Sequence, residues 1–475
     1  MLIRNAEINF ATIVDIRISD GRIAEIATNL TPHSDELTID AKQYALLPGL
    51  HDHHLHFLAS AAALDSVFCG PPNIADEVAL IAALQAKAEQ LKNKQRWLRG
   101  IGYHESVAGN IDRHWLDRVL PTIPARIQQR SGRLWIFNSC ALNLLGDLEN
   151  SPLEEIDGEY SGRLYDADVW LREKIGHQLP DIRAASTQLA RFGVTGITDT
   201  SVSNSGATFA QFAELQVRGE LLQDVVMMGD ASLDAVADTP QLRRGPRKIH
   251  LHENELPDFD AMCAAIESSH ATARPVAVHC VTLVDLIFTL NAFAAAGTIR
   301  GDRIEHAAIA PPEVIAQLKQ LQLIVVTQPN FISERGDAYL EDVEPADQPW
   351  LYRLQGFIDA GIHLVAGTDA PFGNLNPWLA MHAAVTRCTA TGKSIGVNEA
   401  LNAERALELF LGDPLFPGDG KNLIELGMPG NFCLLDLAWR DARHNLSEVN
   451  VLATIKNGRL IWSHSSPDFK LRFSD

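Results

Sequence analysis

The sequence predicts an α/β protein: a (β/α)8 barrel of the TIM type that carries a small β-sandwich built from both chain ends. Three observations predict this fold. The middle of the chain alternates short, continuously apolar runs with helical stretches, as parallel strands buried on both faces do. Titratable residues end several of these runs, at intervals of about one strand–helix unit. Both chain ends instead alternate apolar and polar residues around hairpin turns.

The two chain ends predict one composite sandwich. Asp20-Gly21 and Asn457-Gly458 are dipeptides that favour two-residue hairpin turns. The strands expected near these turns are Val14–Ser19, Arg22–Ile26, Phe432–Leu437, Val451–Lys456 and Arg459–Trp462. We therefore expect residues 1–50 and 425–475 to form the sandwich, and residues 51–424 to form the barrel.

The middle of the chain supplies the barrel strands. The candidates are Leu134–Phe137, Gly193–Asp199, Arg247–Leu251, Pro275–His279, Arg303–His306, Leu323–Thr327 and Ile362–Gly367. Helical patterns such as Asp260–Glu267 lie between them. Residues 66–162 exceed one strand–helix unit and include a predicted helix, Asp76–Lys92, so this segment is expected to form an insertion near the barrel mouth.

Composition excludes several classes of function. The 475 residues include 60 acidic and 40 basic side chains, for a net charge of −20, which disfavours nucleic-acid and anionic-membrane partners. No apolar run reaches the roughly 18 residues of a membrane-spanning helix. The first residues lack the pattern of a signal peptide, and the six cysteines form no CxxC pair. These features predict a cytoplasmic protein with reduced thiols.

The segment Pro48–Phe57, PGLHDHHLHF, holds four histidines within six positions. Residues two apart on a strand point the same way, so His54 and His56 can aim two imidazoles at one point. His51 and His53 face the other way on a regular strand. Two convergent imidazoles are what a metal site needs, although an isolated HxH pattern is equally compatible with a chance cluster.

Three further residues strengthen the metal hypothesis. His279, His306 and Asp369 each follow an apolar run, at the strand ends where barrel enzymes carry catalytic groups. One histidine in such a place is usually a satisfied core residue. Three strand ends with His, His and Asp, together with the HxH pair, make coincidence a poor explanation.

Motifs along almost the whole chain resemble the amidohydrolase superfamily, and within it the amidohydrolase-3 branch of enzymes similar to N-substituted formamide deformylase. The motifs are PGLHDHHLHF (48–57), GVTGITD (193–199), GPRKIHL (245–251), AVHC (277–280), DRIEHA (302–307) and GTDAPFGNLNPW (367–378). The resemblance implies a divalent metal site, with zinc as the expected metal and one or two ions per chain. The ligands that it implies are His54, His56, Lys248, His279, His306 and Asp369. Lys248 would serve as a carboxylated, bridging lysine; an uncarboxylated lysine beside a single metal is the alternative.

One departure from the branch bears on the substrate. Gly132-Arg133 stands where the branch usually has Gly-His, a histidine usually assigned to the substrate pocket. The substrate residues are therefore sought on the insertion and the loops at the strand ends. The candidates are Tyr103, Arg133, Arg163, Gln328, Asn330 and Phe372.

The resemblance implies hydrolysis of a non-peptide, amide-type carbon–nitrogen bond, linear or cyclic, in a small molecule through a metal-activated water. Asp369 is the expected proton shuttle. One alternative is a mononuclear deaminase of an aminated heterocycle, but those enzymes have Glu where this chain has Thr282. A non-catalytic assembly protein is a second alternative, but such relatives lose ligands that this chain keeps. A small-molecule substrate is the expected partner, and a homodimer is compatible with the sequence.

Overall fold

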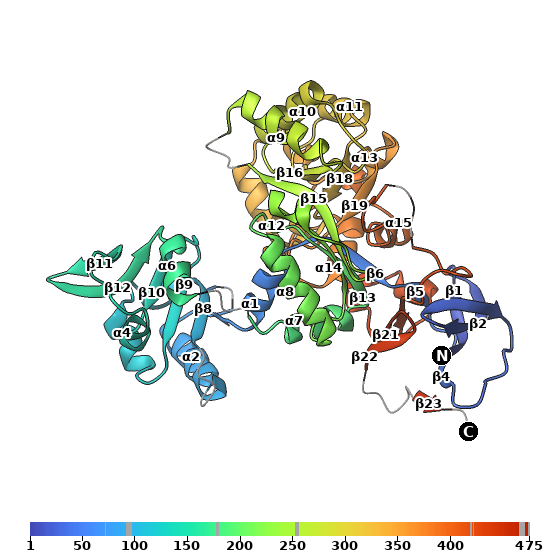
Figure 1. The fold of residues 1–475 in the computed structure, drawn as a ribbon, viewed down its shortest axis with the longest axis horizontal. Coiled ribbons are helices and arrows are strands. Elements are labelled where there is room, and N and C mark those ends of the chain that lie inside the picture. The colour runs from blue at the N-terminus through green and yellow to red at the C-terminus, as the bar shows by residue number, and fades with distance from the viewer. Residues whose placement is uncertain are drawn as a thin grey trace. The chain divides into compact units, whose positions relative to one another are not determined.

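The chain divides into two units, Met1–Phe57 together with Ala185–Asp475, and Leu58–Ala184. The structure is a computed structural model that describes residues 1–71, 73–91, 97–176, 180–251, 256–418, 420, 422–464 and 471–473. Figure 1 draws both units, and each is described by itself.

A barrel of eight parallel strands forms the centre of the first unit, which confirms the predicted fold class (Figure 1). Its strands are β6 (Leu50–Leu55), β13 (Val194–Asp199), β14 (Asp224–Gly229), β15 (Leu242–His250), β16 (Val276–Cys280), β17 (Arg303–His306), β18 (Ile324–Thr327) and β19 (Leu364–Ala366). Each neighbouring pair is parallel, from β6–β13 to β18–β19. The predicted set lacks β14, and its Leu134–Phe137 strand lies in the second unit.

Backbone hydrogen bonds join the chain after β19 to β6. Asp369 N donates to His54 O at 2.7 Å, and His56 N donates to Ala370 O at 2.8 Å. The ring of strands therefore closes at its C-terminal edge, in the same place where the HxH segment and Asp369 meet.

Helices cover the outside of the barrel. They are α7 (Arg183–Arg191), α8 (Gly206–Val217), α9 (Phe259–His270), α10 (Leu283–Ala296), α11 (Pro312–Gln320), α12 (Asn330–Asp342), α13 (Gln355–Asp359), α14 (Pro377–Thr386) and α15 (Ala403–Glu408). In α10, Leu286, Leu290 and Phe293 recur at helical spacing and are buried against the strands. Thr282 caps this helix by accepting a hydrogen bond from Asp285 N at 3.1 Å.

Strands from both chain ends form two further sheets of the first unit. One sheet has the order β23 (Leu471–Phe473), β4 (Leu37–Asp40), β1 (Leu2–Ile8), β2 (Thr12–Ser19), β3 (Arg22–Ala27). The other has the order β22 (Arg459–Ser463), β21 (Val451–Lys456), β20 (Phe432–Leu435), β5 (Leu46–Pro48). Side chains from both sheets, including Ile16, Phe432 and Ile455, share one buried cluster. Asp20 and Gly21 both have positive φ (51° and 77°), as a type I′ turn requires.

The second unit, Leu58–Ala184, has its own six-stranded sheet. The sheet order is β11 (Leu153–Ile156), β12 (Glu159–Tyr165), β10 (Leu134–Phe137), β9 (Ala125–Gln129), β8 (Leu98–Tyr103), β7 (Val67–Phe68). Its helices are α2 (Glu77–Leu91), α3 (Glu105–Ala108), α4 (Arg113–Val119), α5 (Ser139–Leu144) and α6 (Asp168–Ile175), while α1 (Phe57–Leu64) begins at the boundary. Alternate residues of β10 serve different apolar clusters, with Ile136 in one and Trp135 in the other. The predicted position of this insertion near the barrel mouth stays a prediction.

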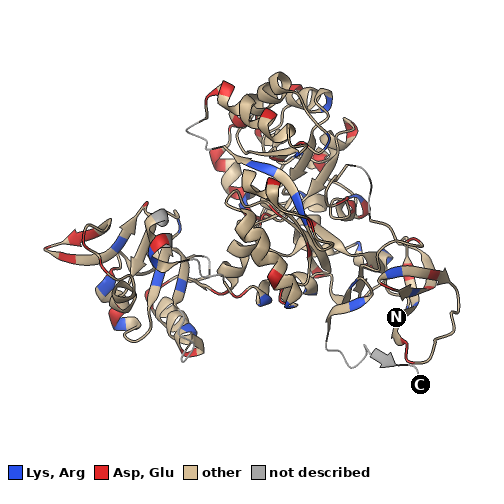
Figure 2. Ribbon diagram, viewed as in Figure 1, with Lys and Arg blue, Asp and Glu red and all other residues tan. Residues whose placement is uncertain are grey.

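Acidic and basic residues are interspersed along the ribbon of both units (Figure 2). Among the described helices, none combines the length and the hydropathy that a membrane span requires.

Candidate metal centre

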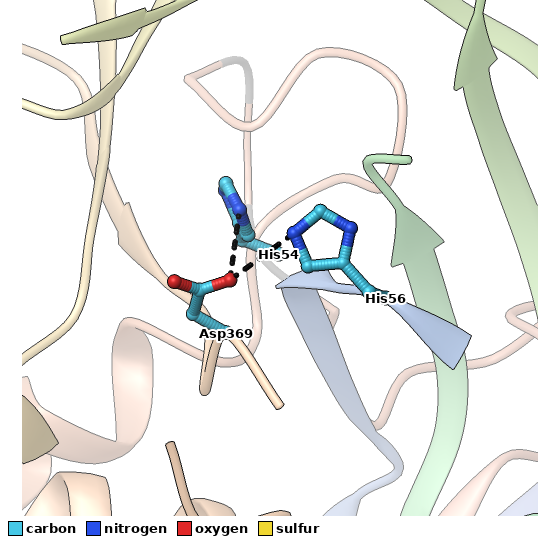
Figure 3. A group of neighbouring side chains, drawn as sticks. All are labelled: His54, His56 and Asp369. Carbon is cyan, nitrogen blue, oxygen red and sulfur yellow. Dashed lines mark ion pairs between the residues drawn. The ribbon is translucent and has the colours of Figure 1, made fainter. Parts of the chain in front are cut away.

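His54 and His56 extend from the end of β6 toward one carboxylate. Their Nε2 atoms each lie 3.4 Å from the same oxygen, Asp369 Oδ1 (Figure 3). Two ligand atoms that are each about 2.0–2.1 Å from a tetrahedral zinc ion lie about 3.3 Å apart, so these spacings fit shared coordination. The ligand atoms of all three residues lie within 4.8 Å of one another. The strand alternation predicted from the sequence thus brings two imidazoles to one point.

Two more histidines lie beside this cluster. The His306 ring centroid is 4.8 Å from that of His54, and the His279 centroid is 4.4 Å from that of His306. Both residues stand at the ends of neighbouring strands, since β16 pairs with β17. His306 has a φ of 70° and Asp369 a φ of 53°. Left-handed backbone at a bulky residue is costly, and such costs concentrate at functional sites.

Lys248 supplies the observation that best tests whether the residues fit a metal. Its side chain is buried, and its Nζ has no hydrogen-bond partner within the described part of the chain. Asp369 Oδ1 likewise accepts no hydrogen bond from a described residue. A buried amine and a buried carboxylate oxygen are costly without partners. Cations held by the histidines, with Lys248 carboxylated, would satisfy both groups, so the donor set fits the metal site that the family implies.

The second ring nitrogen of each of three histidines has a partner. His54 Nδ1 contacts Glu305 Oε2, His56 Nδ1 lies 3.1 Å from Ser201 Oγ, and His306 Nδ1 lies 2.7 Å from Gln328 Oε1. A carboxylate and an amide oxygen each require an N–H on Nδ1, which leaves Nε2 with a lone pair. The rings are therefore oriented with Nε2 available to a cation. In metal-binding histidines, the ring nitrogen that does not bind the metal usually has a hydrogen-bond partner that fixes the ring in this way.

Glu305 is the charged residue among the partners of the histidine Nδ1 atoms. It is fully buried, contacts His54, and pairs with Arg303, whose Nη2 donates to His53 O at 3.0 Å. Burial alone would raise its pKa, but Arg303, Lys248 and His54 hold the pKa of Glu305 well below its usual range. The anionic Glu305 and Asp369 in turn raise the pKa of His54 against the effect of burial.

Burial and neighbouring charges also shift the pKa values of Lys248, His306 and Asp369. Burial lowers the pKa of Lys248, and Glu305 partly opposes this. Burial, followed by His54, lowers the pKa of His306 to about 3. The pKa of Asp369, which burial would raise, is held well below its usual range by His54 and His56. At neutral pH, Asp369 is therefore an ionised carboxylate.

Asp52 fixes the register between β6 and the chain after β19. Its Oδ1 accepts from His54 N and Thr368 N, both at 3.1 Å, and its Oδ2 accepts from Thr368 Oγ at 2.6 Å. These bonds hold the backbones of His54 and Asp369 side by side. Sequence reasoning missed Asp52, Ser201, Arg303 and Glu305, although two of them lie within the quoted DRIEHA motif.

The remaining histidines of the PGLHDHHLHF segment point away from the cluster. His51 Nε2 lies 2.9 Å from Thr198 Oγ1, and His53 is buried with neither ring nitrogen bonded to a described residue. His250, two residues after Lys248, stacks on His279 with 4.2 Å between ring centroids. His252 and Glu253, which would be the next candidates for proton transfer if Asp369 does not serve, lie outside the described residues.

The six predicted substrate residues fall into two groups. Gln328 and Asn330 are buried at the barrel edge, where Gln328 contacts His306 and Asn330 Nδ2 donates to Thr368 O at 3.0 Å. The Phe372 ring is exposed and meets the His56 ring edge-on at 5.5 Å. These three residues adjoin the predicted metal ligands.

Tyr103, Arg133 and Arg163 belong to the second unit. The Tyr103 hydroxyl donates to Gly109 O at 2.6 Å, and Arg163 Nη2 donates to Ile111 O at 2.7 Å. Arg133 is exposed and paired with Asp166 at 2.6 Å. Each therefore has a structural contact inside its own unit, and a role in binding substrate stays a prediction.

The chain resembles known hydrolases in sequence and in fold. The chain is 24% identical to an N-substituted formamide deformylase of Arthrobacter pascens, with 94% of each chain covered. Among solved structures, a metal-dependent hydrolase of Pyrococcus furiosus superposes with a TM-score of 0.72 at 20% identity, covering 90% of this chain and 97% of that one. N-isopropylammelide isopropylaminohydrolase of Burkholderia multivorans gives 0.53 at 16% identity, with 97% of each chain covered.

A profile of the amidohydrolase-3 branch, described as the amidohydrolase family, matches residues 37–462. The match includes the barrel, the second unit and all six predicted ligands. The chain therefore belongs to the amidohydrolase family, in its amidohydrolase-3 branch, and is a metal-dependent hydrolase of carbon–nitrogen bonds.

Proposed function

We propose that this enzyme hydrolyses the amide-type carbon–nitrogen bond of an N-substituted formamide or a closely related small amide. The observation that carries the proposal is the convergence of His54 Nε2 and His56 Nε2 on Asp369 Oδ1, beside a buried Lys248 Nζ without a partner. The formamide class is taken from the Arthrobacter pascens relative.

The cation is proposed to be zinc, with one or two ions per chain. It would be held by His54, His56, His279, His306, Asp369 and carboxylated Lys248. When bound, a divalent cation supplies Lewis acidity that polarises the amide carbonyl and lowers the pKa of water at the site to about 7.

Asp369 is proposed to move the proton. Its carboxylate is ionised, lies at the C-terminal mouth of the barrel, and has one buried oxygen without a hydrogen bond from the described residues. It would accept a proton from the attacking water and deliver it to the departing nitrogen, because an amide nitrogen leaves poorly unless it is protonated. Water and a formamide then give formate and an amine.

The deaminase alternative requires a glutamate three residues after His279, where this chain has Thr282. Thr282 caps α10 through its side chain, and no carboxylate replaces the glutamate that such enzymes carry there. The free cysteines suit the reducing cytoplasm proposed for the enzyme. A homodimer stays a prediction.

The proposed function is tested with N-benzylformamide. Protein loaded with Zn²⁺ is expected to release formate and benzylamine in equal amounts. Treatment with a chelator should lower the rate at least about 100-fold, and re-addition of Zn²⁺ should restore it, since a bound metal supplies several kcal/mol of transition-state stabilisation.

A panel with acetamides, cyclic amides and an aminotriazine is assayed beside it. Release of ammonia from the aminotriazine, without formamide hydrolysis, would support the deaminase alternative instead. Formamide hydrolysis that is unaffected by metal removal would overturn the metal-dependent mechanism.

A further inference from the structure

An apolar cluster stands beside the metal ligands at the C-terminal edge of the barrel. It contains the buried residues Ala308, Phe331, Ile332, Leu351, Tyr352 and Ile395, with Tyr339 packed against it. Tyr352 N donates to Ala308 O at 2.8 Å, and Ala308 is two residues beyond His306. Burial, and to a smaller extent the Asp369 carboxylate, raises the pKa of both Tyr339 and Tyr352. This cluster, termed the wall, therefore adjoins the strand end that carries His306.

Arg335, in the second turn of α12, lies on this wall in a fixed orientation. Its guanidinium carbon is 4.1 Å from the centroid of the Phe331 ring, and its Nη2 donates to Phe372 O at 2.6 Å. Tyr339, one turn further along α12, packs against the same apolar cluster. Because the Phe372 ring meets the metal ligand His56, Arg335 is connected to the metal centre through one residue. A guanidinium held on several sides loses little entropy when it binds a ligand.

Arg335 is exposed and forms no ion pair with any described residue. Its neighbour Glu334 is engaged elsewhere, because Glu334 Oε1 accepts from Asn374 N at 3.0 Å and from Asn330 Nδ2 at 3.4 Å. Arg303 and Arg353, by contrast, each pair with a glutamate. Arg335 thus presents, near the metal centre, a guanidinium that lies outside ion-pair distance of the described carboxylates.

We propose that Arg335 is a specificity-determining residue that binds a carboxylate on the substrate. This proposal rests on the proposed function and narrows its substrate class to amides whose far end carries one carboxylate, joined by an apolar segment. The remaining N–H groups of Arg335 can donate to the carboxylate as a fork, and Phe372 and Tyr339 flank the apolar segment. Glu334 and Asp369 nearby would repel a doubly charged phosphate, which favours a single negative charge.

The test compares matched substrates. N-formyl ω-amino acids with two to six carbons in the acid are paired with N-formyl alkylamines in which a methyl group replaces the carboxylate. Formate release gives kcat/KM for each compound with zinc-loaded wild type, Arg335→Gln and Arg335→Lys. Wild type is expected to prefer the best carboxylate over its neutral partner by about 10- to 100-fold, the range for a charged hydrogen bond. Arg335→Gln should reduce this preference to about one, and Arg335→Lys should retain part of it.

The preference ratio separates recognition from a purely structural role, because a disturbed loop would slow both members of a pair alike. Arg440→Gln is the matched control, since Arg440 lies in the short helix α16 (Trp439–Ala442), is largely exposed and, among the described residues, pairs with Asp441 alone. That control should keep the wild-type preference. A preference that survives Arg335→Gln, or that wild type lacks while hydrolysing formamides, would overturn the proposal.

A binding measurement separates this proposal from the proposed function. Calorimetry with hexanoate on zinc-loaded wild type and Arg335→Gln detects the guanidinium without any turnover. A loss of at least about tenfold in affinity on substitution supports the carboxylate subsite even if no formamide is hydrolysed. Equal affinities overturn the subsite and leave the hydrolase assignment untouched.

Discussion

Replacing both His54 and His56 with alanine is expected to lower the bound metal from one or two ions per chain to background and to abolish hydrolysis. These two imidazoles supply two of the three converging ligand atoms at the site, and both face Asp369 Oδ1 at 3.4 Å. A cation held between them and Asp369 would lose two of its ligands, so loss of metal and loss of rate should coincide. Metal content by mass spectrometry and formate release, on the same preparation, check this result.

The matched control replaces two exposed histidines outside the cluster, His33 and His444. That double variant should keep its metal, its rate and its melting temperature. Melting of the His54/His56 variant should be compared with metal-free wild type, which separates loss of ligands from loss of folding. Stoichiometric metal retained by a folded His54/His56 variant would remove the basis of the site assignment.

Asp369→Asn is expected to lower kcat by about 10² to 10⁴ while the protein stays folded, because proton transfer by a positioned group is commonly worth that much. An amide keeps an oxygen in place of Oδ1 and so preserves much of the local geometry, but it cannot accept the proton of water. Asp369 N also donates to His54 O, a backbone bond that the substitution leaves intact. Metal content, thermal melting and kcat are measured on one preparation.

Asp441→Asn is the control for this prediction, since Asp441 is exposed and pairs with Arg440 at 3.4 Å. It should turn over like wild type. Near-wild-type kcat in Asp369→Asn with the metal retained would show that another group moves the proton. His252 and Glu253 would then be the first residues to substitute.

The barrel could be predicted because its strands end in recognisable residues. His279, His306 and Asp369 each follow a continuous apolar run, so both the strand and its end are visible in the sequence. Strand β14, Asp224–Gly229, has no such marker: Val-Val-Met-Met is an apolar run that fits a buried helix equally well. Its pairing with both β13 and β15 depends on contacts between segments that are distant in sequence.

The convergence of His54, His56 and Asp369 could be predicted, but the side chains that contact the histidines from behind could not. Alternation along a strand places Glu305 and His306 on opposite faces. In the structure, His306 has a φ of 70°, and both residues lie against His54. Sequence pattern cannot show such a local break in the strand. Gln328 illustrates the same limit, because its position at a strand end suggests contact with substrate, whereas its Oε1 lies 2.7 Å from His306 Nδ1.

The second unit, Leu58–Ala184, was recognisable only as a segment too long for one strand–helix repeat. Its sheet combines parallel and antiparallel pairs, and no periodicity in the sequence specifies that order. The contacts of Arg163 show why its role was hard to judge. A buried arginine that donates to backbone carbonyls of Asn110 and Ile111 has the same sequence signature as one that binds a ligand.

The most direct test of the metal-centre assignment is anomalous diffraction at the zinc edge from crystals of the zinc-loaded enzyme. We expect one or two peaks about 2.0–2.1 Å from Nε2 of His54 and His56. We also expect planar density that extends Lys248 Nζ into a carbamate, because Nζ is buried without a hydrogen-bond partner among the described residues. Crystals with the same side-chain arrangement but no anomalous peak, and with a bare Lys248 ammonium, would contradict the assignment.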